Sequence, residues 1–191
     1  MGHRKQRRSG LTRMASVDLL AIGRVSVDLY AEQINEPMRN VTSFKKSIGG
    51  TATNVAVAAA RLGVPAALGT RVGDDEFGDY VRHALTHTFN VDSRYVGVDD
   101  ALQTPLAFAE MDPPDEPSII FYREPRAPDL NMEPSDFDAE LIQSVPILWF
   151  PASRFSDERA GNTVRELLSL RERRSHTVLD LDWRPMFWDS A

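Results

Sequence analysis

Short apolar runs alternate with segments of helical periodicity along most of the chain. The runs lie at 17–22, 66–72, 146–150 and 177–181, and each has the length of a buried strand. Between them lie an Ala- and Val-rich helical segment at 53–62 and amphipathic segments at 75–89 and 156–173. This alternation predicts an α/β fold: a doubly wound, three-layer, mostly parallel sheet with right-handed crossovers.

Two further pairs of segments have the alternating pattern of half-exposed strands. One pair is 29–33 and 41–48, and the other is 104–111 and 118–123, with a proline-rich loop at 113–117. Strict alternation of polar and apolar residues is typical of antiparallel hairpins with one solvent-exposed face. We expect these hairpins, at 29–48 and 104–123, to stand outside the layers of the main sheet, as a small lid or a contact surface between copies.

The strand at 177–181 is followed only by residues 182–191, and these have no helical pattern. Open α/β sheets are normally covered by helices on both faces. We therefore expect this strand to be an edge, and the chain to be the N-terminal part of a longer fold.

Composition and charge narrow the class of protein. Apolar residues make up 42% and charged residues 26% of the 191 residues, which is typical of a globular chain. The net charge of −6 argues against a nucleic-acid surface. The basic residues of segment 1–14 predict a disordered tail, and the rest, 15–191, forms the folded part. Cysteine is absent and no apolar run approaches the ~20 residues of a membrane span, so we expect a cytoplasmic protein without membrane contact.

The candidate chemistry begins at Gly49-Gly50, which opens directly into the helix that contains Asn54. A helix N-terminus with adjacent glycines lets a polar ligand approach the backbone N–H groups. The alternative is a helix start with glycines for packing and Thr51 or Thr53 as the cap. Asp28, after a buried strand and Gly23, offers a carboxylate for two sugar hydroxyls, or is a solvated turn residue.

Other sites have weaker support. The sequence contains neither a Gly-x-Gly-x-x-Gly nor a Gly-x4-Gly-Lys-Ser/Thr motif, which argues against dinucleotide and P-loop sites. His83 and His87 stand four apart on a predicted helix, without the carboxylate of a His-Glu-x-x-His motif. We interpret them as exposed helix residues and predict no metal site.

The spacing Gly49-Gly50-x3-Asn54-x-Ala56-x6-Gly63-x9-Gly73, followed by Gly73-Asp74-Asp75-x-Phe77-Gly78, resembles the first signature of the ribokinase (PfkB-type) carbohydrate kinase family. Within it, segments 23–30, 121–130 and 180–188 resemble the 5-dehydro-2-deoxygluconokinase group of inositol catabolism. The resemblance covers nearly everything from Val17 to Trp188, and the two hairpins resemble the β-lid of the family.

The resemblance implies roles for particular residues. Asp28, the backbone of Gly49 and Gly50, and Asn54 would hold substrate hydroxyls. Arg123 and Arg184 stand where kinases of 2-keto-3-deoxy acids place arginines, and a guanidinium suits a carboxylate. Related kinases often have a tyrosine two residues before the first arginine. Here that residue is Phe121, and Tyr122 is included in the expected substrate-binding set. From the residues alone, the favoured interpretation is a solvated lid residue for Arg123 and a surface loop charge for Arg184.

The family transfers phosphate from ATP, with Mg²⁺, to a sugar hydroxyl, using a Gly-Ala-Gly-Asp-type motif in the C-terminal half. No such motif occurs in these 191 residues, so we expect no catalytic residue in this chain and no activity from it alone. The resemblance implies that the full-length parent phosphorylates 5-dehydro-2-deoxygluconate and forms a homodimer through the β-lid. The alternatives are a kinase of another sugar or 2-keto-3-deoxy acid, a non-catalytic sugar-binding or dimerisation module, or a remnant of a disrupted gene.

Overall fold

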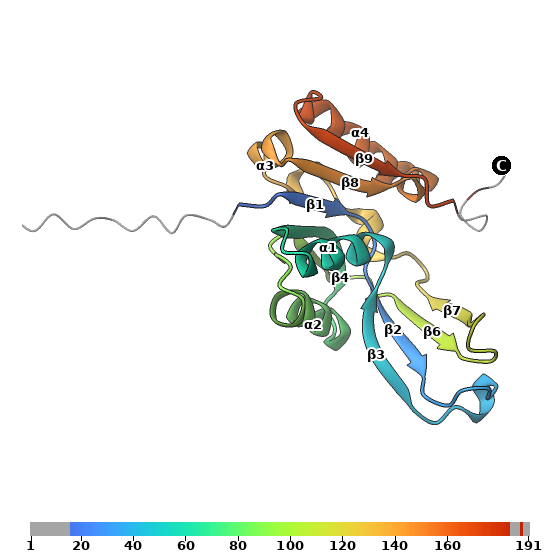
Figure 1. Ribbon diagram of the computed structural model, residues 1–191. Coiled ribbons are helices and arrows are strands. Elements are labelled where there is room, and N and C mark those ends of the chain that lie inside the picture. Colours follow the sequence, from blue (N-terminus) through green and yellow to red (C-terminus); the bar gives the residue numbers. More distant parts are fainter. Residues whose placement is uncertain (1–15, 184–187, 189–191) are drawn as a thin grey trace, which may run out of the picture.

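The computed structural model describes residues 16–183 and residue 188. The predicted tail at 1–14 lies outside these residues. Two sheets make up the fold, with four α-helices packed on the larger one (Figure 1). The helices are α1 (Thr51–Arg61), α2 (Glu76–His83), α3 (Ala139–Ser144) and α4 (Glu158–Arg171).

The larger sheet is parallel and has the strand order β5-β4-β1-β8-β9. Its strands are β1 (Leu19–Ile22), β4 (Ala66–Gly73), β5 (Val96–Asp99), β8 (Ile147–Pro151) and β9 (His176–Asp180). The doubly wound α/β class is confirmed, but the sheet has a strand that the apolar pattern did not predict, β5. This strand has only four residues, one of them Gly97, and is too short to give a clear periodic signal.

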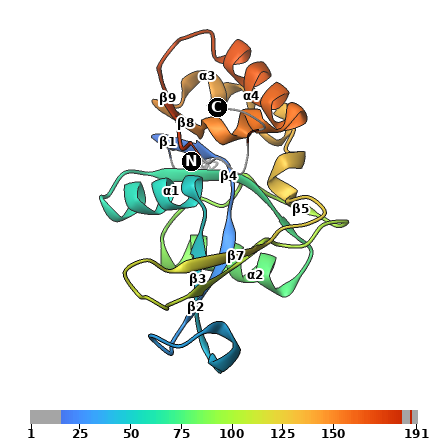
Figure 2. The ribbon, with the colours of Figure 1, turned by 90° about the vertical axis from the view of Figure 1, so that its right-hand side faces the viewer.

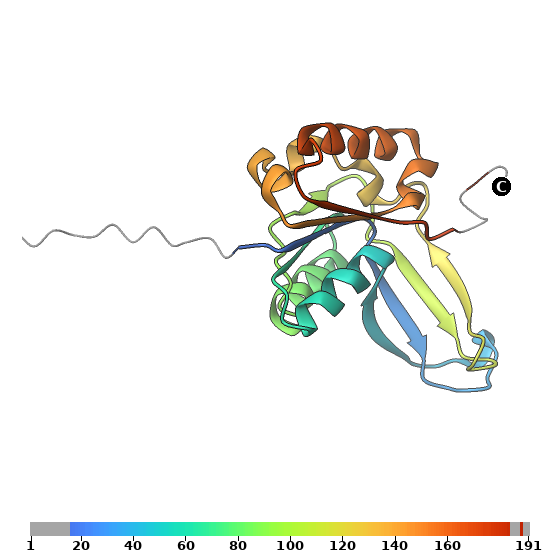
Figure 3. The same cartoon turned by 45° about the horizontal axis from the view of Figure 1, so that its top comes forward.

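Alternate residues of the central strand β1 belong to two separate cores. Leu19 and Ala21 pack with residues of α1 and α2, whereas Leu20 and Ile22 pack with residues of α3 and α4. The helices therefore cover opposite faces of the parallel sheet (Figure 3). This three-layer arrangement is the one that the alternation of strands and helices predicts.

The second sheet has the order β3-β2-β6-β7, and it unites the two predicted hairpins. Its strands are β2 (Ser26–Ala31), β3 (Phe44–Gly49), β6 (Leu106–Glu110) and β7 (Ser118–Tyr122). Each hairpin is antiparallel as expected, and a parallel pairing of β2 with β6 joins them. The sheet projects from the carboxyl ends of the parallel strands, with the segment between β2 and β3 at its tip (Figures 1 and 2).

The observed α-helix α2 is shorter than the helix that the apolar pattern predicts at 75–89. The α-helix ends at His83, and Ala84–Thr88 forms a π-helical turn. Thr86 donates its hydroxyl to the Arg82 carbonyl oxygen (3.0 Å), a backbone contact that apolar periodicity does not encode. The exposed rings of His83 and His87 lie 4.6 Å apart between centroids.

Asp75 ties the start of α2 to the second sheet. Its two carboxylate oxygens accept hydrogen bonds from the backbone N–H groups of Gly78 and Thr104, both at 2.8 Å. The Thr104 hydroxyl in turn accepts from the Gly73 N–H at 3.0 Å. The Gly73-Asp74-Asp75 segment thus fixes the chain that enters β6.

The edge strand β9 is held by a buried arginine of α4. Arg171 donates to the carbonyl oxygens of Ile142 (2.6 Å) and His176 (2.7 Å), and so joins the end of α3 to β9. The side chains of Val178 and Leu179 on β9 are exposed. The predicted edge position of this strand is confirmed. No helix among the described residues is long and apolar enough to cross a membrane.

Candidate functional site

A cavity of about 820 Å³ lies where the two sheets meet. One wall comes from the second sheet, and the other comes from segments that follow the parallel strands and from the start of α1. The carboxyl edge of a parallel sheet is where open α/β folds bind ligands. Of the predicted site residues, the cavity is lined by Asp28, Gly50, Asn54 and Arg123.

The strand register of the second sheet places small residues of its middle strand, β6, on the face that lines the cavity. Asp28 of β2 lies opposite Ala107 of β6, which lies opposite Phe121 of β7. The next cavity-facing row is Tyr30, Ala109 and Ile119. The two alanines leave room in the middle strand, because their side chains are a single methyl group.

Asp28 is a half-buried acceptor within β2. The sequence placed it after a strand of the main sheet, whereas it lies inside a strand of the second sheet. Its carboxylate accepts a hydrogen bond from the Ser26 hydroxyl (2.6 Å) and a long one from the Tyr30 hydroxyl (3.4 Å). Burial raises the pKa of the Asp28 carboxyl, and these two hydrogen bonds partly offset the increase.

The two glycines have different roles. Gly50 has φ of +101°, and a Cβ there would lie 2.3 Å from the Arg24 carbonyl oxygen. Gly49 has no such backbone requirement, but a Cβ there would lie 1.9 Å from Oδ2 of Asp28. Gly50 therefore makes the sharp entry into α1, while Gly49 leaves space for the carboxylate.

The start of α1 is open to the cavity. Gly50 is the N-cap, and no side chain caps the helix. The alternative that Thr51 or Thr53 is the cap is wrong: Thr51 donates its hydroxyl to Asp182 (2.9 Å), and Thr53 donates to the Arg24 carbonyl oxygen (3.2 Å). Asn54 is exposed in the first turn and lines the cavity.

Strand β7 brings Phe121, but not Tyr122, to the cavity. Neighbouring residues of a strand point to opposite faces, and the Tyr122 ring packs edge-on against Phe108, with centroids 5.4 Å apart. Tyr122 is 60% exposed. The guanidinium of Arg123 lies 4.7 Å from the centre of the Phe121 ring. Burial and the nearby charge of Arg24 lower the pKa of Arg123. Arg184 lies outside the described residues.

The sequence analysis missed a group of charged residues on the opposite wall. Arg24 donates Nε and Nη2 to Asp129 (2.9 and 3.4 Å), and Arg154 donates Nη1 to the same carboxylate (2.9 Å). Arg126 holds both oxygens of Asp157 (2.7 and 2.9 Å). Arg24 and Arg154 follow soon after β1 and β8, and charged residues directly after buried strands were the available signal.

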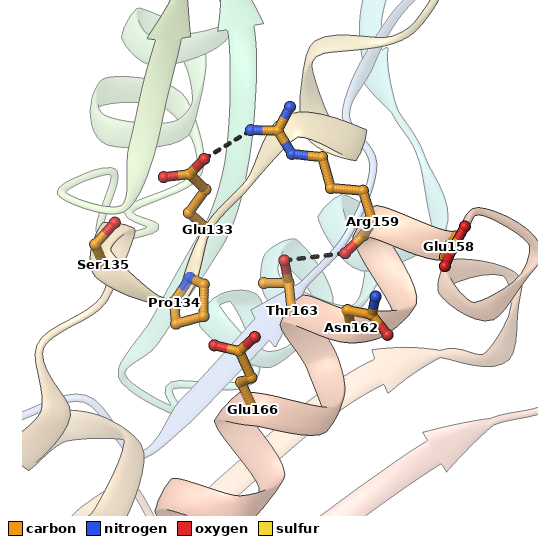
Figure 4. A pocket seen from close by; sticks show the side chains of 8 residues that line it. All are labelled: Glu133, Pro134, Ser135, Glu158, Arg159, Asn162, Thr163 and Glu166. Carbon is orange, nitrogen blue, oxygen red and sulfur yellow. Dashed lines mark hydrogen bonds and ion pairs between the residues drawn. The ribbon is translucent and has the colours of Figure 1, made fainter.

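A second pocket, of about 630 Å³, lies between α4 and the segment at 133–135 (Figure 4). Figure 4 shows Arg159 paired with Glu133, at 2.6 Å, with both side chains half exposed. Glu158 and Glu166 also line it. None of the predicted site residues within 16–183 line this pocket, so the cavity between the sheets is the better candidate.

The chain matches the family model "pfkB family carbohydrate kinase" over residues 17–191. It is 34% identical over 178 residues to a 5-dehydro-2-deoxygluconokinase of Geobacillus kaustophilus, covering 91% of this chain and 52% of that protein. The chain therefore spans about half the length of the curated relatives that it matches.

Solved structures agree with the fold. A sugar kinase from Pyrococcus horikoshii in complex with ATP is 27% identical, with a TM-score of 0.77 over 89% of this chain and 55% of that one. A PfkB protein from Polaromonas sp. JS666 is 24% identical, with a TM-score of 0.82 over 92% of this chain and 59% of that one. The ribokinase-like fold that the motifs indicate is thereby confirmed.

Proposed function

The chain belongs to the pfkB family of carbohydrate kinases, and from this premise we propose that its cavity binds the sugar-acid substrate of an ATP-dependent kinase. The proposed substrate of the whole protein is 5-dehydro-2-deoxygluconate, the substrate in the name of the relative from Geobacillus kaustophilus. The observation that carries the proposal is the cavity itself. It combines a carboxylate acceptor on one wall, Asp28, with guanidinium donors, Arg123 among them.

The chemistry of the cavity suits a hydroxylated acid. The Asp28 carboxylate has lone pairs for two sugar hydroxyls, and Asn54 offers both a donor and an acceptor. A guanidinium binds a carboxylate through two parallel hydrogen bonds, which a neutral sugar lacks the acceptors to form. Phe121, under Arg123, provides an apolar surface for the carbon skeleton.

ATP, when bound, supplies the phosphoryl group, with Mg²⁺ as its partner ion. No cluster of three His, Asp or Glu side chains within residues 16–183 is suited to hold a metal ion. The residues of this chain are therefore assigned to binding and orienting the sugar, and no phosphoryl-transfer step is assigned to them. In this proposal the second sheet acts as the lid over the sugar, and the whole protein acts in the cytoplasm.

The test is the effect of Arg123→Gln on ligand binding, measured by calorimetry. We expect the affinity for 5-dehydro-2-deoxygluconate to fall about 10- to 100-fold, since a hydrogen-bonded charge contact contributes ~1.5–3 kcal/mol. Binding of neutral 2-deoxyglucose should change far less. Arg174→Gln, at an exposed arginine that pairs with Glu172, is the control. An equal loss for the acid and the neutral sugar would contradict the assignment.

A further inference from the structure

Arg154 is a buried arginine that the proposed role of Arg123 does not explain. It lies in the 3-10 turn η5 (Ala152–Ser156), directly after β8, and lines the cavity between the sheets. Only 2% of the residue is exposed. Burying a guanidinium costs folding free energy unless its N–H groups have hydrogen-bond acceptors, so the hydrogen bonds of Arg154 indicate its role.

Among the residues that the structure describes, one of the three guanidinium nitrogens of Arg154 has a partner. Nη1 donates to Oδ2 (2.9 Å) and to the carbonyl oxygen (3.0 Å) of Asp129. Nε and Nη2 are buried and have no hydrogen-bond partner among the described residues. An unpaired buried donor of a charged group costs more free energy than a neutral one. We therefore expect these two N–H groups to bind an acceptor.

The two unpaired nitrogens form the edge with which arginines hold an oxyanion. In this same chain, Nε and Nη2 of Arg71 bind the two oxygens of Asp136, at 3.0 and 2.7 Å. Arg24 presents the same edge to Asp129. Nε and Nη2 of Arg154 therefore have the spacing that a carboxylate or phosphate requires.

The neighbouring carboxylates are already engaged. Asp129 is shared between Arg24 and Arg154, and Asp157 is held at both oxygens by Arg126. Burial lowers the pKa of Arg154, and the positive charges of Arg24 and Arg126 lower it further. The negative charges of Asp129 and Asp157 raise it, but the net pKa remains lowered. Three arginines thus share these two carboxylates, and neither carboxylate accepts a hydrogen bond from Nε or Nη2 of Arg154.

We propose that Nε and Nη2 of Arg154 bind the anionic terminus of the ligand, a carboxylate or a phosphate. This inference rests on the proposed function for the choice of a sugar as the ligand, and it adds Arg154 to Arg123 as a residue that selects an acid over a neutral sugar. The residue is a specificity determinant and not a catalytic residue. Its contact with Asp129 fixes the guanidinium, so that the unpaired edge is in place before the ligand arrives.

The experiment compares wild type with Arg154→Lys by calorimetry. The probes are 5-dehydro-2-deoxygluconate, its neutral carboxamide and inorganic phosphate. A lysine keeps the positive charge and is long enough for one hydrogen bond to Asp129. It lacks the pair of nitrogens that can bind both oxygens of an anion. We expect about 10- to 100-fold weaker binding of the acid and unchanged binding of the carboxamide. Arg174→Lys, the same change at an exposed ion pair, should leave both unchanged.

A second measurement covers the case in which Arg154→Lys folds poorly. In ¹⁵N-labelled Arg123→Gln, which keeps Arg154, one arginine Nε–H resonance should still shift when the acid is added and stay in place with the carboxamide. No shifting arginine Nε–H would overturn the proposal, as would equal acid affinity in a folded Arg154→Lys.

The outcomes also separate this inference from the proposed function. Acid binding that is the same in wild type and Arg154→Lys would remove the subsite and leave the sugar-acid function standing. Binding of phosphate that depends on Arg154, without binding of the acid, would support the oxyanion subsite and remove the sugar-acid function. Absence of binding of any of the three probes would overturn both.

Discussion

At the scale of single residues, the candidate site depends on the lack of a side chain at Gly49, beside Asp28. A Cβ at Gly49 would lie closer to Oδ2 of Asp28 than any two non-bonded atoms can approach. The carboxylate occupies the space that a side chain on β3 would take, while Ser26 and Tyr30 orient it from its own strand. The position of the acceptor is therefore set by a glycine on the neighbouring strand.

Gly49→Ala should displace the Asp28 carboxylate and weaken sugar binding by calorimetry more than it weakens the fold. We expect the free energy of unfolding to fall by about 1–3 kcal/mol from overpacking, as measured by urea denaturation. Gly161→Ala in α4 is the control, because its new Cβ would meet first the flexible end of Arg165, at 3.2 Å. Retention of full affinity in folded Gly49→Ala would contradict the role of this glycine.

At the scale of elements, α2 is joined to the second sheet through its N-cap. Burial raises the pKa of the Asp75 carboxyl, but hydrogen bonds from Thr104 and Gly78 outweigh it, and the net pKa lies below the ordinary 3.8. The folded state thus favours the charged carboxylate, and it binds fewer protons than the unfolded state at acidic pH. The resulting stabilisation is present in full above the unfolded pKa and is lost as pH falls through the folded pKa.

Asp75→Ala should lower the free energy of unfolding at pH 7 by about 1–2 kcal/mol, because it removes the cap of α2 and the acceptor for Thr104. The difference from wild type should shrink as the pH falls below 3.8. Urea denaturation at several pH values measures both effects. Asp74→Ala, at the exposed neighbouring carboxylate, should change stability by less than about 0.5 kcal/mol. A difference that does not depend on pH would refute the charge-based account.

At the scale of the whole molecule, the second sheet presents apolar side chains to solvent. All five residues of its edge strand β7 are exposed, and the outer face carries Ile120 opposite Phe108. An edge strand with exposed apolar residues is suited to pairing with another chain. We propose that two copies associate through this sheet, in keeping with the dimer that the family resemblance implies.

Ile120→Lys should shift the sedimentation coefficient from that of a dimer toward that of a monomer, because it places a charge on the proposed contact face. The control is Leu62→Lys, a similarly apolar position that is 84% exposed and lies at the end of α1, outside the second sheet. A wild-type chain that sediments as a monomer at all accessible concentrations would exclude the dimer.

The sequence by itself determined the local elements and the class of the fold. The periodicity of apolar residues predicted eight of the nine strands among the described residues within a few residues, with β2 and β3 as a hairpin, because buried faces need repeating side chains. The sequence motifs selected Asp28, Gly50 and Asn54, which lie next to predicted strand or helix boundaries, and the family resemblance added Arg123. The structure brings these four to one cavity.

The tertiary structure alone decided which side chains share that cavity. The register of β7 against β6 turns Phe121 inward and Tyr122 outward, and a pattern within one strand does not fix this choice. Arg24 and Asp129 are 105 positions apart, and Arg154 joins them only where the ends of β1 and β8 meet. Periodicity reports which face of an element is buried, whereas contacts between distant polar side chains depend on how the finished layers pack.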